Sequence, residues 1–162
     1  MCSQPYSEII LVIDTIRSRT AHLYQAIEDS PLGLLGHSDA DLLAHTVSDA
    51  LLGAAGLPDI GNLFPASDGA YRNADSMELL RRVVERVRKE RWTIVWVDAV
   101  IQAQIPRLNA HLPEMRSRLS ALLNPGGPNC VNLKAKSAEG TGDPGLGRSM
   151  TCIVIFFRGS DC

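Results

Sequence analysis

Four stretches along the chain predict strands, and all but 130–136 are apolar and rich in β-branched residues, which is the pattern of buried strands. They cover residues 7–14, 93–104, 130–136 and 151–157. Pro106 ends the second stretch, and the turn-rich segment 124–128 precedes the third. Residues 140–147 are rich in glycine and predict a loop before the last strand. The polar segment 17–25 favours neither a helix nor a strand.

Between these strands, apolar residues recur at intervals of three and four, which predicts amphipathic helices. In the first such segment Ser38 is expected to cap the helix, and Asp41 lies three positions later, as in a capping box. Gly56 and Pro58 are expected to end this helix. Its apolar positions are Leu42, Leu43, Val47, Ala50, Leu51 and Ala54.

Two further helices are expected. One begins near Asp75 with Glu78 at the matching box position, and the other runs from Leu112 to Leu122. The basic residues of the former fall opposite its apolar stripe, which is typical of a solvated face. They are Arg81, Arg82, Arg88 and Lys89. Since strands and helices alternate along the chain, the expected class is α/β or α+β, with a sheet covered by helices.

Length and composition indicate one globular domain, because 162 residues, of which 45% are hydrophobic, are enough for an ordinary packed core. The 16 basic and 18 acidic residues leave a formal net charge of -2, which argues against non-specific binding to nucleic acid. Only 5% of the residues are aromatic, which also argues against a surface on which bases stack.

The sequence also argues against a membrane or exported protein. The apolar run Ile9–Ile13 is far shorter than the roughly 20 residues of a spanning helix, and Met1 to Ser3 lacks the basic start of a signal peptide. The four cysteines form no C-x-x-C pair, so reduced thiols in a cytoplasmic protein are expected, and a cysteine-rich zinc site is not.

The densest group of chemically active side chains is His37-Ser38-Asp39-Ala40-Asp41, followed by His45. Asp41 and His45 are four residues apart, so on a helix they share a face and can meet one ligand or metal ion. His37 precedes the helix start, where unpaired backbone N–H groups favour phosphate. Taken alone, the same residues are equally consistent with a capping box and two solvent-exposed histidines.

Three other stretches are candidates for ligand contacts. Asp59-Ile60-Gly61 with Phe64 forms a compact polar loop after the first helix, which ordinary turn chemistry also explains. Residues 104–108 leave a strand end, where loops often hold ligands, although a connector with a surface arginine has the same composition. The stretch 134–139, KAKSAE, suits a phosphate and a divalent cation, or equally a charged rim.

The order and spacing of these stretches resemble 2-C-methyl-D-erythritol 2,4-cyclodiphosphate synthase, an enzyme family of the non-mevalonate isoprenoid route. Residues 34–68 read LLGHSDADLLAHTVSDALLGAAGLPDIGNLFPASD, which is close to the signature of that family. The resemblance continues in register through ADSMELL, VDAVIQAQIPRL, HLPEMR and VNLKAKSAE. It therefore covers Leu34 to roughly Glu139.

This resemblance implies one cyclodiphosphate-synthase-like domain over residues 1–162, with the sheet covered on one face by helices. It implies an enzyme that converts a cytidine-diphosphate-linked methylerythritol 2-phosphate to the cyclodiphosphate and releases CMP. Family members use zinc and a second divalent cation, Mg²⁺ or Mn²⁺, and they are homotrimers with active sites between subunits. The expected partners are therefore a nucleotide diphosphate substrate and further copies of the chain.

The positions that match the family imply the site residues. Asp14 and His45 match zinc ligands, and Glu139 matches the carboxylate that holds the second cation. His37 matches a phosphate-contacting residue, and Ser137 falls where the family has a threonine that stabilises the transition state, so both are expected to be catalytic. The expected substrate contacts are Ser38, Asp59, Ile60, Gly61, Phe64, Gln104, Pro106, Arg107, Leu108, Lys136 and Ala138.

The sequence departs from the family pattern at several positions. Ile16 stands where the family has the histidine of its amino-terminal D-x-H zinc motif, and no spacing argument links His22 to the site. Lys136 adds a positive charge beside the expected diphosphate, and Leu146 and Ile153 replace charged residues of the carboxy-terminal part. Two alternatives therefore stay open: a paralogue that cleaves a different nucleotide or phosphoester, and a non-catalytic nucleotide-binding homologue.

Overall fold

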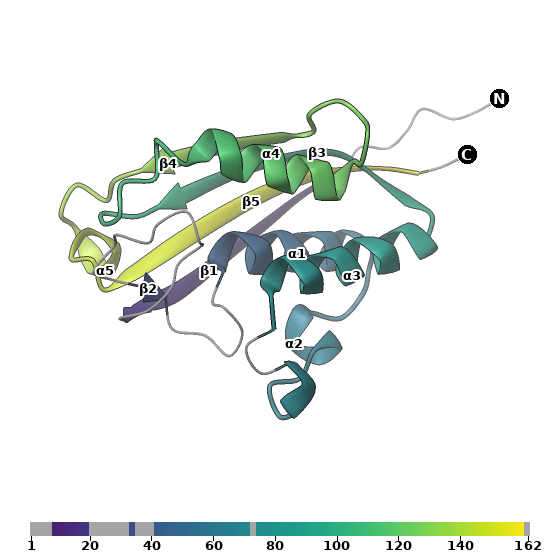
Figure 1. Cartoon of the computed structure of the whole chain (residues 1–162), viewed down its shortest axis with the longest axis horizontal. Helices are drawn as coiled ribbons and strands as arrows, with labels where there is room; N and C mark the ends of the chain where they lie inside the picture. The colour runs from purple at the N-terminus through teal and green to yellow at the C-terminus, as the bar shows by residue number, and fades with distance from the viewer. Residues whose placement is uncertain (1–7, 20–32, 35–40, 72–73, 161–162) are drawn as a thin grey trace.

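The computed structural model of the chain describes residues 8–19, 33–34, 41–71 and 74–160. At its centre is a five-stranded mixed sheet in the order β2-β1-β5-β3-β4 (Figure 1). Strand β5 pairs antiparallel with both β1 and β3, whereas β4 runs parallel to β3. The strands are β1 (Glu8–Arg19), β2 (Gly33–Leu34), β3 (Trp92–Gln102), β4 (Val131–Lys136) and β5 (Ser149–Ser160).

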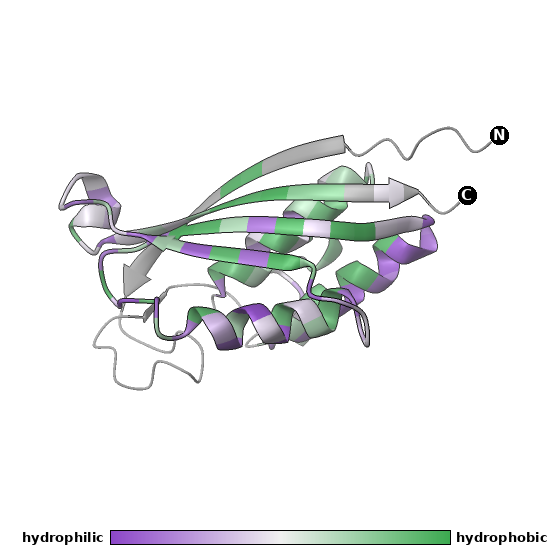
Figure 2. Ribbon diagram, turned by 90° about the horizontal axis from the view of Figure 1, so that it is seen from above, coloured by the Kyte–Doolittle hydropathy of each residue, from purple (hydrophilic) through white to green (hydrophobic). Residues whose placement is uncertain are grey.

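Three long helices form one layer against this sheet. Helix α1 packs on β1 and β5, α3 packs on β3, and α4 packs on β4, all on the same face (Figures 1 and 2). The helices are α1 (Leu42–Ala54), α2 (Ile60–Leu63), α3 (Ser76–Lys89), α4 (Leu112–Leu123) and α5 (Gly142–Gly145), with a single 3-10 turn at Gly69–Tyr71. Among the described residues, no helix has both the length and the apolar composition that a bilayer span requires.

The hydrophobic core lies between the helical layer and the sheet. Alternate residues of the central strands, such as Val97, Val154 and Phe156, are fully buried beneath the helices. Helix α1 is buried on most of its surface, since ten of its 13 residues are inaccessible. Even its hydroxyl groups are internal: Thr46 and Ser48 each donate to a backbone carbonyl one turn back, at 2.7 Å.

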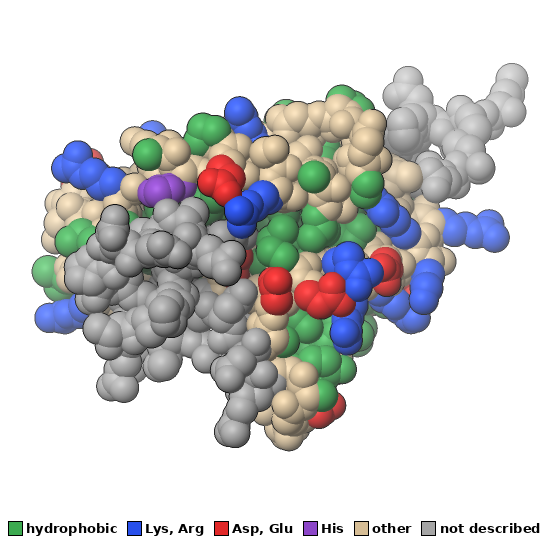
Figure 3. Space-filling model, in the orientation of Figure 1, with side chains coloured by type: hydrophobic (Ala, Val, Ile, Leu, Met, Phe, Trp, Pro, Cys, Tyr) green, Lys and Arg blue, Asp and Glu red, His purple; other side chains and the backbone are tan. Residues whose placement is uncertain are grey.

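Helix α3 buries one stripe and exposes a charged one, as the sequence predicts. Asp75 caps it by accepting a hydrogen bond from Met77 N at 2.8 Å. Glu78 does not complete a capping box; its carboxylate instead accepts hydrogen bonds from Arg81 and Arg82, which lower the pKa of Glu78. Figure 3 shows acidic and basic side chains intermixed over this helix. The basic run is therefore a solvated face with its own counter-charges.

Helix α1 begins later than the sequence suggested, and the expectation that Ser38 caps it is wrong. The N-cap is Asp41, whose backbone is extended (φ −70°, ψ 96°) and whose Oδ1 accepts a hydrogen bond from Ala44 N at 3.0 Å. A carboxylate at this position satisfies an unpaired amide and also faces the positive end of the helix, which favours Asp41 as the cap. Oδ1 of Asp41 is therefore engaged by the helix end rather than turned toward a ligand shared with His45.

The structure also assigns a polar segment that the sequence left open and corrects the expectation of a plain glycine-rich loop. The polar residues before Arg19 continue β1, because pairing with β5 supplies the backbone hydrogen bonds that composition alone does not indicate. The glycine-rich segment 140–147 contains the short helix α5 instead of a plain loop. A Cβ at Gly145 would lie 2.4 Å from the carbonyl carbon of Gly140, so this turn closes only because glycine allows the two backbones to approach.

The opposite face of the sheet carries none of the long helices α1, α3 and α4 (Figure 2), and apolar residues of three strands lie side by side on it. Ile13 on β1 pairs with Ile153 on β5, and Ile153 pairs in turn with Val100 on β3. Ile13 is 61% exposed and Trp96 on β3 is 37% exposed. An apolar row thus crosses the sheet on its uncovered side.

Candidate active site

Helix α1 reaches the surface along a single stripe. Its three residues that are not fully buried, His45, Asp49 and Gly53, are four apart and therefore share one face. His45 is half-buried, and its Nε2 lies 3.4 Å from the Oγ of Ser76, the first residue of α3. Since Ser76 is only 1% exposed, this contact orients the imidazole from inside the protein.

The turn formed by residues 59–61 is attached to the same stripe. Asp59 caps the four-residue helix α2, because its Oδ1 accepts hydrogen bonds from the backbone N and the side-chain Nδ2 of Asn62, at 2.8 and 2.9 Å. The N–H of Ile60 donates to Oδ1 of Asp49 at 2.8 Å. A side chain of α1 therefore holds the backbone of the turn, one helical turn beyond His45.

Two more of the expected substrate contacts lie in this turn or shortly after it. Gly61 is exposed, and a Cβ at this position would lie 3.4 Å from Oδ1 of Asp59. Phe64 packs edge-on against the ring of Tyr71, with 5.2 Å between the ring centroids. The structure therefore gathers residues 59–61 and 64 at the end of α1 and α2; we call these residues, with His45, Asp49 and Ser76, the helix group.

A second group of expected residues lies where the parallel strands β3 and β4 end. Gln102 pairs with Lys136, and Ala103 N donates to the Lys136 carbonyl at 3.0 Å. Because parallel strands end at the same edge of a sheet, residues 104–108 and 137–139 leave it side by side. We call the residues 104–108 and 136–139 the strand-end group.

Within the strand-end group, residues 104–108 combine a buried anchor with accessible polar groups. Leu108 is 3% exposed, whereas the guanidinium-bearing Arg107 is exposed and follows the cis bond between Ile105 and Pro106. Oε1 of Gln104 is buried and has no hydrogen-bond partner among the described residues. A ligand that carries an N–H donor would satisfy that oxygen, and the exposed guanidinium of Arg107 suits an anionic group.

The other half of the strand-end group is a tight turn. Ser137 Oγ donates to Oε1 of Glu139 at 2.7 Å, and buried Ala138 accepts hydrogen bonds at its carbonyl from the N–H and the hydroxyl of Thr141. Glu139 has a φ of +50°, in the left-handed region that residues with a Cβ rarely adopt. The turn holds a hydroxyl and a carboxylate together at the surface, a donor set that suits a hard divalent cation.

Lys134 belongs to neither group, although its position in KAKSAE suggests a phosphate contact. Its Nζ donates to Oδ2 of Asp98 at 2.7 Å, while Asn132 Nδ2 donates to the other carboxylate oxygen at 2.9 Å. The charge of Lys134 is thus neutralised within the sheet. Lys136, at the last position of β4, is exposed and has no ion pair within the described chain.

Several expected residues lie outside the description. His37, Ser38 and His22 fall outside the described residues. Asp14 and Ile16 are described by their backbone alone, opposite Cys152 and Met150 on β5. In the part of the chain that is described, no three His, Cys, Asp or Glu side chains gather as metal ligands do.

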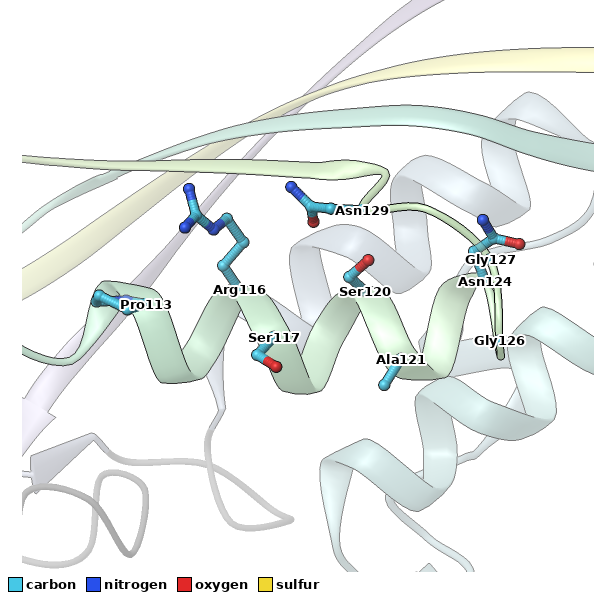
Figure 4. A pocket seen from close by; sticks show the side chains of 9 residues that line it. All are labelled: Pro113, Arg116, Ser117, Ser120, Ala121, Asn124, Gly126, Gly127 and Asn129. Atoms are coloured by element: carbon cyan, nitrogen blue, oxygen red, sulfur yellow. The ribbon is translucent and has the colours of Figure 1, made fainter.

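The turn that contains α2 and the strand-end group lie apart within one chain. Figure 1 shows α2 at the lower edge of the helical layer, whereas the end of β4 and α5 lie at the far left edge of the sheet. A surface cavity of about 400 Å³ is a third location, between α4 and the loop before β4 (Figure 4). None of the expected site residues lines it. Asn124 there donates to the Pro128 carbonyl of the same loop, and Asn129 donates to the Val131 carbonyl at the start of β4.

Comparison with known proteins decides the family. The model of the YgbB family matches residues 21–157, most of the chain. The chain belongs to the YgbB family. It is 46% identical over 129 residues to the 2-C-methyl-D-erythritol 2,4-cyclodiphosphate synthase of Alkalilimnicola ehrlichii, an alignment that covers 80% of this chain and 78% of that protein.

Solved structures of this YgbB protein's relatives have the same fold. A 2C-methyl-D-erythritol-2,4-cyclodiphosphate synthase in a form bound to CDP superposes with a TM-score of 0.82 at 30% identity, covering 93% of this chain and 99% of that one. The bifunctional IspDF of Campylobacter jejuni gives a TM-score of 0.84 at 32% identity. That match covers 96% of this chain but only 43% of the bifunctional protein. The predicted fold class, a sheet with helices, is confirmed.

Two residues of the helix group were not predicted from the sequence of this YgbB protein. Asp49 had a detectable signal, because it follows His45 by four residues on a helix that is otherwise apolar or small. The only sequence signal at Ser76 was its position directly after the cap of α3. Its contact with His45 joins residues 31 positions apart. Such a contact depends on how α1 and α3 pack, which no local pattern encodes.

The positive φ of Glu139 predicts a specific effect on stability. The Glu139→Gly variant is expected to be more stable than Glu139→Ala by about 1 kcal/mol, because only glycine adopts this conformation without strain. Both variants lose the carboxylate, so the difference isolates the backbone; urea titration at fixed protein concentration measures it.

Arg91 supplies the matched control, since its φ is 63° at the end of α3. Arg91→Gly and Arg91→Ala should differ by a similar amount. Equal stabilities for the glycine and alanine variants at position 139 would contradict the argument.

Proposed function

We propose that this chain converts a cytidine-diphosphate-linked methylerythritol 2-phosphate to the cyclic diphosphate with release of CMP. The observation that carries the proposal is the scaffold, which this chain shares with a CDP-bound cyclodiphosphate synthase at a TM-score of 0.82, together with 46% identity over 129 residues to a further synthase. In the reaction an oxygen of the 2-phosphate attacks the diphosphate phosphorus next to methylerythritol. A phosphorus–oxygen bond forms, the bond to CMP breaks, and CMP leaves with the electron pair.

The residues of this chain would act mainly by positioning and by neutralising charge, as expected for phosphoryl transfer. Residues 106–108 of the strand-end group would hold the cytosine, and Asp59 with Gly61 would hold the ribose. His37 and Ser38 would contact phosphate. The hydroxyl of Ser137 would donate to the oxygens that gain charge during transfer, and Lys136 would add a fixed positive charge beside them.

Metal ions fit the donor atoms of this chain. His45 already has a polar partner at one ring nitrogen, which is the usual arrangement for a metal-bound imidazole, so His45 with Asp14 would hold zinc. Glu139 would hold Mg²⁺ or Mn²⁺ through carboxylate oxygen, the ligand type that these cations prefer. Such cations would lower the cost of bringing the phosphate and diphosphate charges together.

We further propose that three copies assemble with active sites between subunits. The helix group and the strand-end group lie at different margins of one chain, so a complete site needs the helix group of one copy and the strand-end group of the next. The uncovered face of the sheet supports assembly, because an apolar row that includes exposed Ile13 crosses it. A cytoplasmic location stays a prediction from the sequence.

Incubation with the cytidine-diphosphate-linked methylerythritol 2-phosphate, zinc and Mg²⁺ tests the reaction. CMP and the cyclic diphosphate should form in equal amounts, measured by chromatography and phosphorus NMR. Ser137→Ala should lower kcat by about 10²–10³-fold, the usual cost of removing a donor to a developing charge. CMP release only from other nucleotide diphosphate esters would favour a repurposed paralogue, and CDP binding without release under any metal condition would favour a non-catalytic homologue.

Elemental analysis tests the metal site separately. The purified protein should carry one zinc per chain, and His45→Ala should lose it. His111→Ala is the matched control, because His111 precedes α4 and makes no side-chain cap bond; this variant should keep zinc. Full zinc content in His45→Ala would remove His45 from the ligand set.

The assembly is tested by light scattering coupled to gel filtration. The unmodified chain should elute as a trimer of about three times 17.6 kDa. Ile153→Glu places a charge in the apolar row and should dissociate the trimer, since an unpaired buried charge is costly. Ser117→Glu adds the same charge on exposed α4 and should leave the trimer intact. A monomeric unmodified chain would contradict the proposal.

A further inference from the structure

Asp49 connects two parts of the helix group that the chain could otherwise move independently. It lies on α1 one turn after His45, on the only stripe of that helix that reaches the surface. Its Oδ1 accepts a hydrogen bond from the N–H of Ile60 at 2.8 Å in a partly buried position. The bond spans 11 residues, so it joins the helix to the turn rather than ordering a local loop.

The turn needs such an anchor. Helix α2 has four residues, none of them buried, and a helix this short is not stable by itself. The side chain of Asp59 satisfies the amide of Asn62 further along α2, and the amide of Ile60 is satisfied from α1. Because this bond is partly buried, water competes with it less than at a fully exposed site, so it can hold a largely exposed turn.

The imidazole of His45 and the backbone of residues 59–61 are therefore held by one rigid body. The orientation of α1 is set by its ten buried residues, and Ser76 fixes the imidazole from the other side. Any ligand that spans His45 and the turn would meet both at a preset separation. Holding groups at preset separations is how an enzyme reduces the entropy that binding and reaction would otherwise cost.

We propose that Asp49 is a positioning residue that presents the turn 59–61 to the ribose of the nucleotide by accepting the Ile60 N–H. This inference rests on the proposed function, because it assigns the turn to nucleotide binding. In this assignment Asp49 acts through the Ile60 amide and not through contact with the substrate or the reacting atoms. Its contribution should therefore appear in nucleotide affinity and KM, while kcat at saturation and zinc content change little.

The test compares three substitutions at position 49 with one on the same helix. Asp49→Ala removes the acceptor, Asp49→Asn keeps an oxygen at Oδ1 without the charge, and Asp49→Glu keeps the charge but moves it. Ser48→Ala is the control. The buried hydroxyl of Ser48 donates to the Ala44 carbonyl within α1 and does not face the turn. Each variant is measured for CDP affinity by calorimetry, for KM and kcat, and for amide exchange of Ile60 by NMR.

Asp49→Ala and Asp49→Glu should weaken CDP binding and raise KM by about tenfold or more, and should speed exchange of the Ile60 amide. Asp49→Asn should restore affinity and protection to within a few-fold of the unmodified chain, and Ser48→Ala should change neither. Should Asp49→Ala not fold, Asp49→Glu and Asp49→Asn still decide the question, because they differ only in where the acceptor lies or in its charge.

Two outcomes would overturn the inference. One is unchanged CDP affinity and KM in Asp49→Ala although the Ile60 amide exchanges faster, which would make the bond purely structural. The other is an equal loss in Asp49→Asn and Asp49→Ala, which would assign the effect to charge rather than to the hydrogen bond. Failure of the proposed function looks different: the unmodified chain would release no CMP, whereas the exchange and CDP measurements would still report on Asp49.

Discussion

The burial of α1 against the sheet and α3 is the constraint on which the rest of the structure depends. With ten of its 13 residues inaccessible, this helix cannot rotate without exposing apolar side chains and burying an imidazole and a carboxylate. Packing in the hydrophobic core therefore sets the direction in which His45 and Asp49 point. Ser76 and the Ile60 amide then fix these two side chains at short range. Packing thus sets the coarse geometry of the helix group, and two polar contacts complete it.

A different constraint holds the strand-end group. Strands β3 and β4 are parallel, so a crossover is needed between them, and α4 supplies it while covering β4. The crossover brings both strands to the same edge, where residues 104–108 and 137–139 emerge together. Each chain consequently carries the strand-end group at an edge of its sheet and the helix group on its helical layer. This is the physical reason for proposing that a site is completed only between copies.

Features with a local cause could be predicted from the sequence, and those with a tertiary cause could not. Helix α3 and the strands β3 and β4 follow from apolar periodicity, and the residues of the strand-end group follow from their order along the chain. The start of α1 was misjudged because both Ser38 and Asp41 are good caps, and local chemistry does not rank them. The continuation of β1 through polar residues depends on pairing with β5, and the role of Asp49 depends on where the chain returns after α1.

Lys134 and Lys136 are two residues apart on β4, yet the structure gives their charges different surroundings. Lys134 forms an ion pair with Asp98 on the uncovered face of the sheet, and this pair links β4 to β3. Lys136 stands at the strand end next to Ser137 and has no counter-charge in the described chain. On the proposed function, diphosphate lies beside this amine. Its attraction would supplement a zinc site in which Ile16 replaces an imidazole, because a nearby fixed cation and a metal ion stabilise the same developing negative charge. On the proposed function, the two departures from the family pattern, at Ile16 and Lys136, are thus compatible with one another.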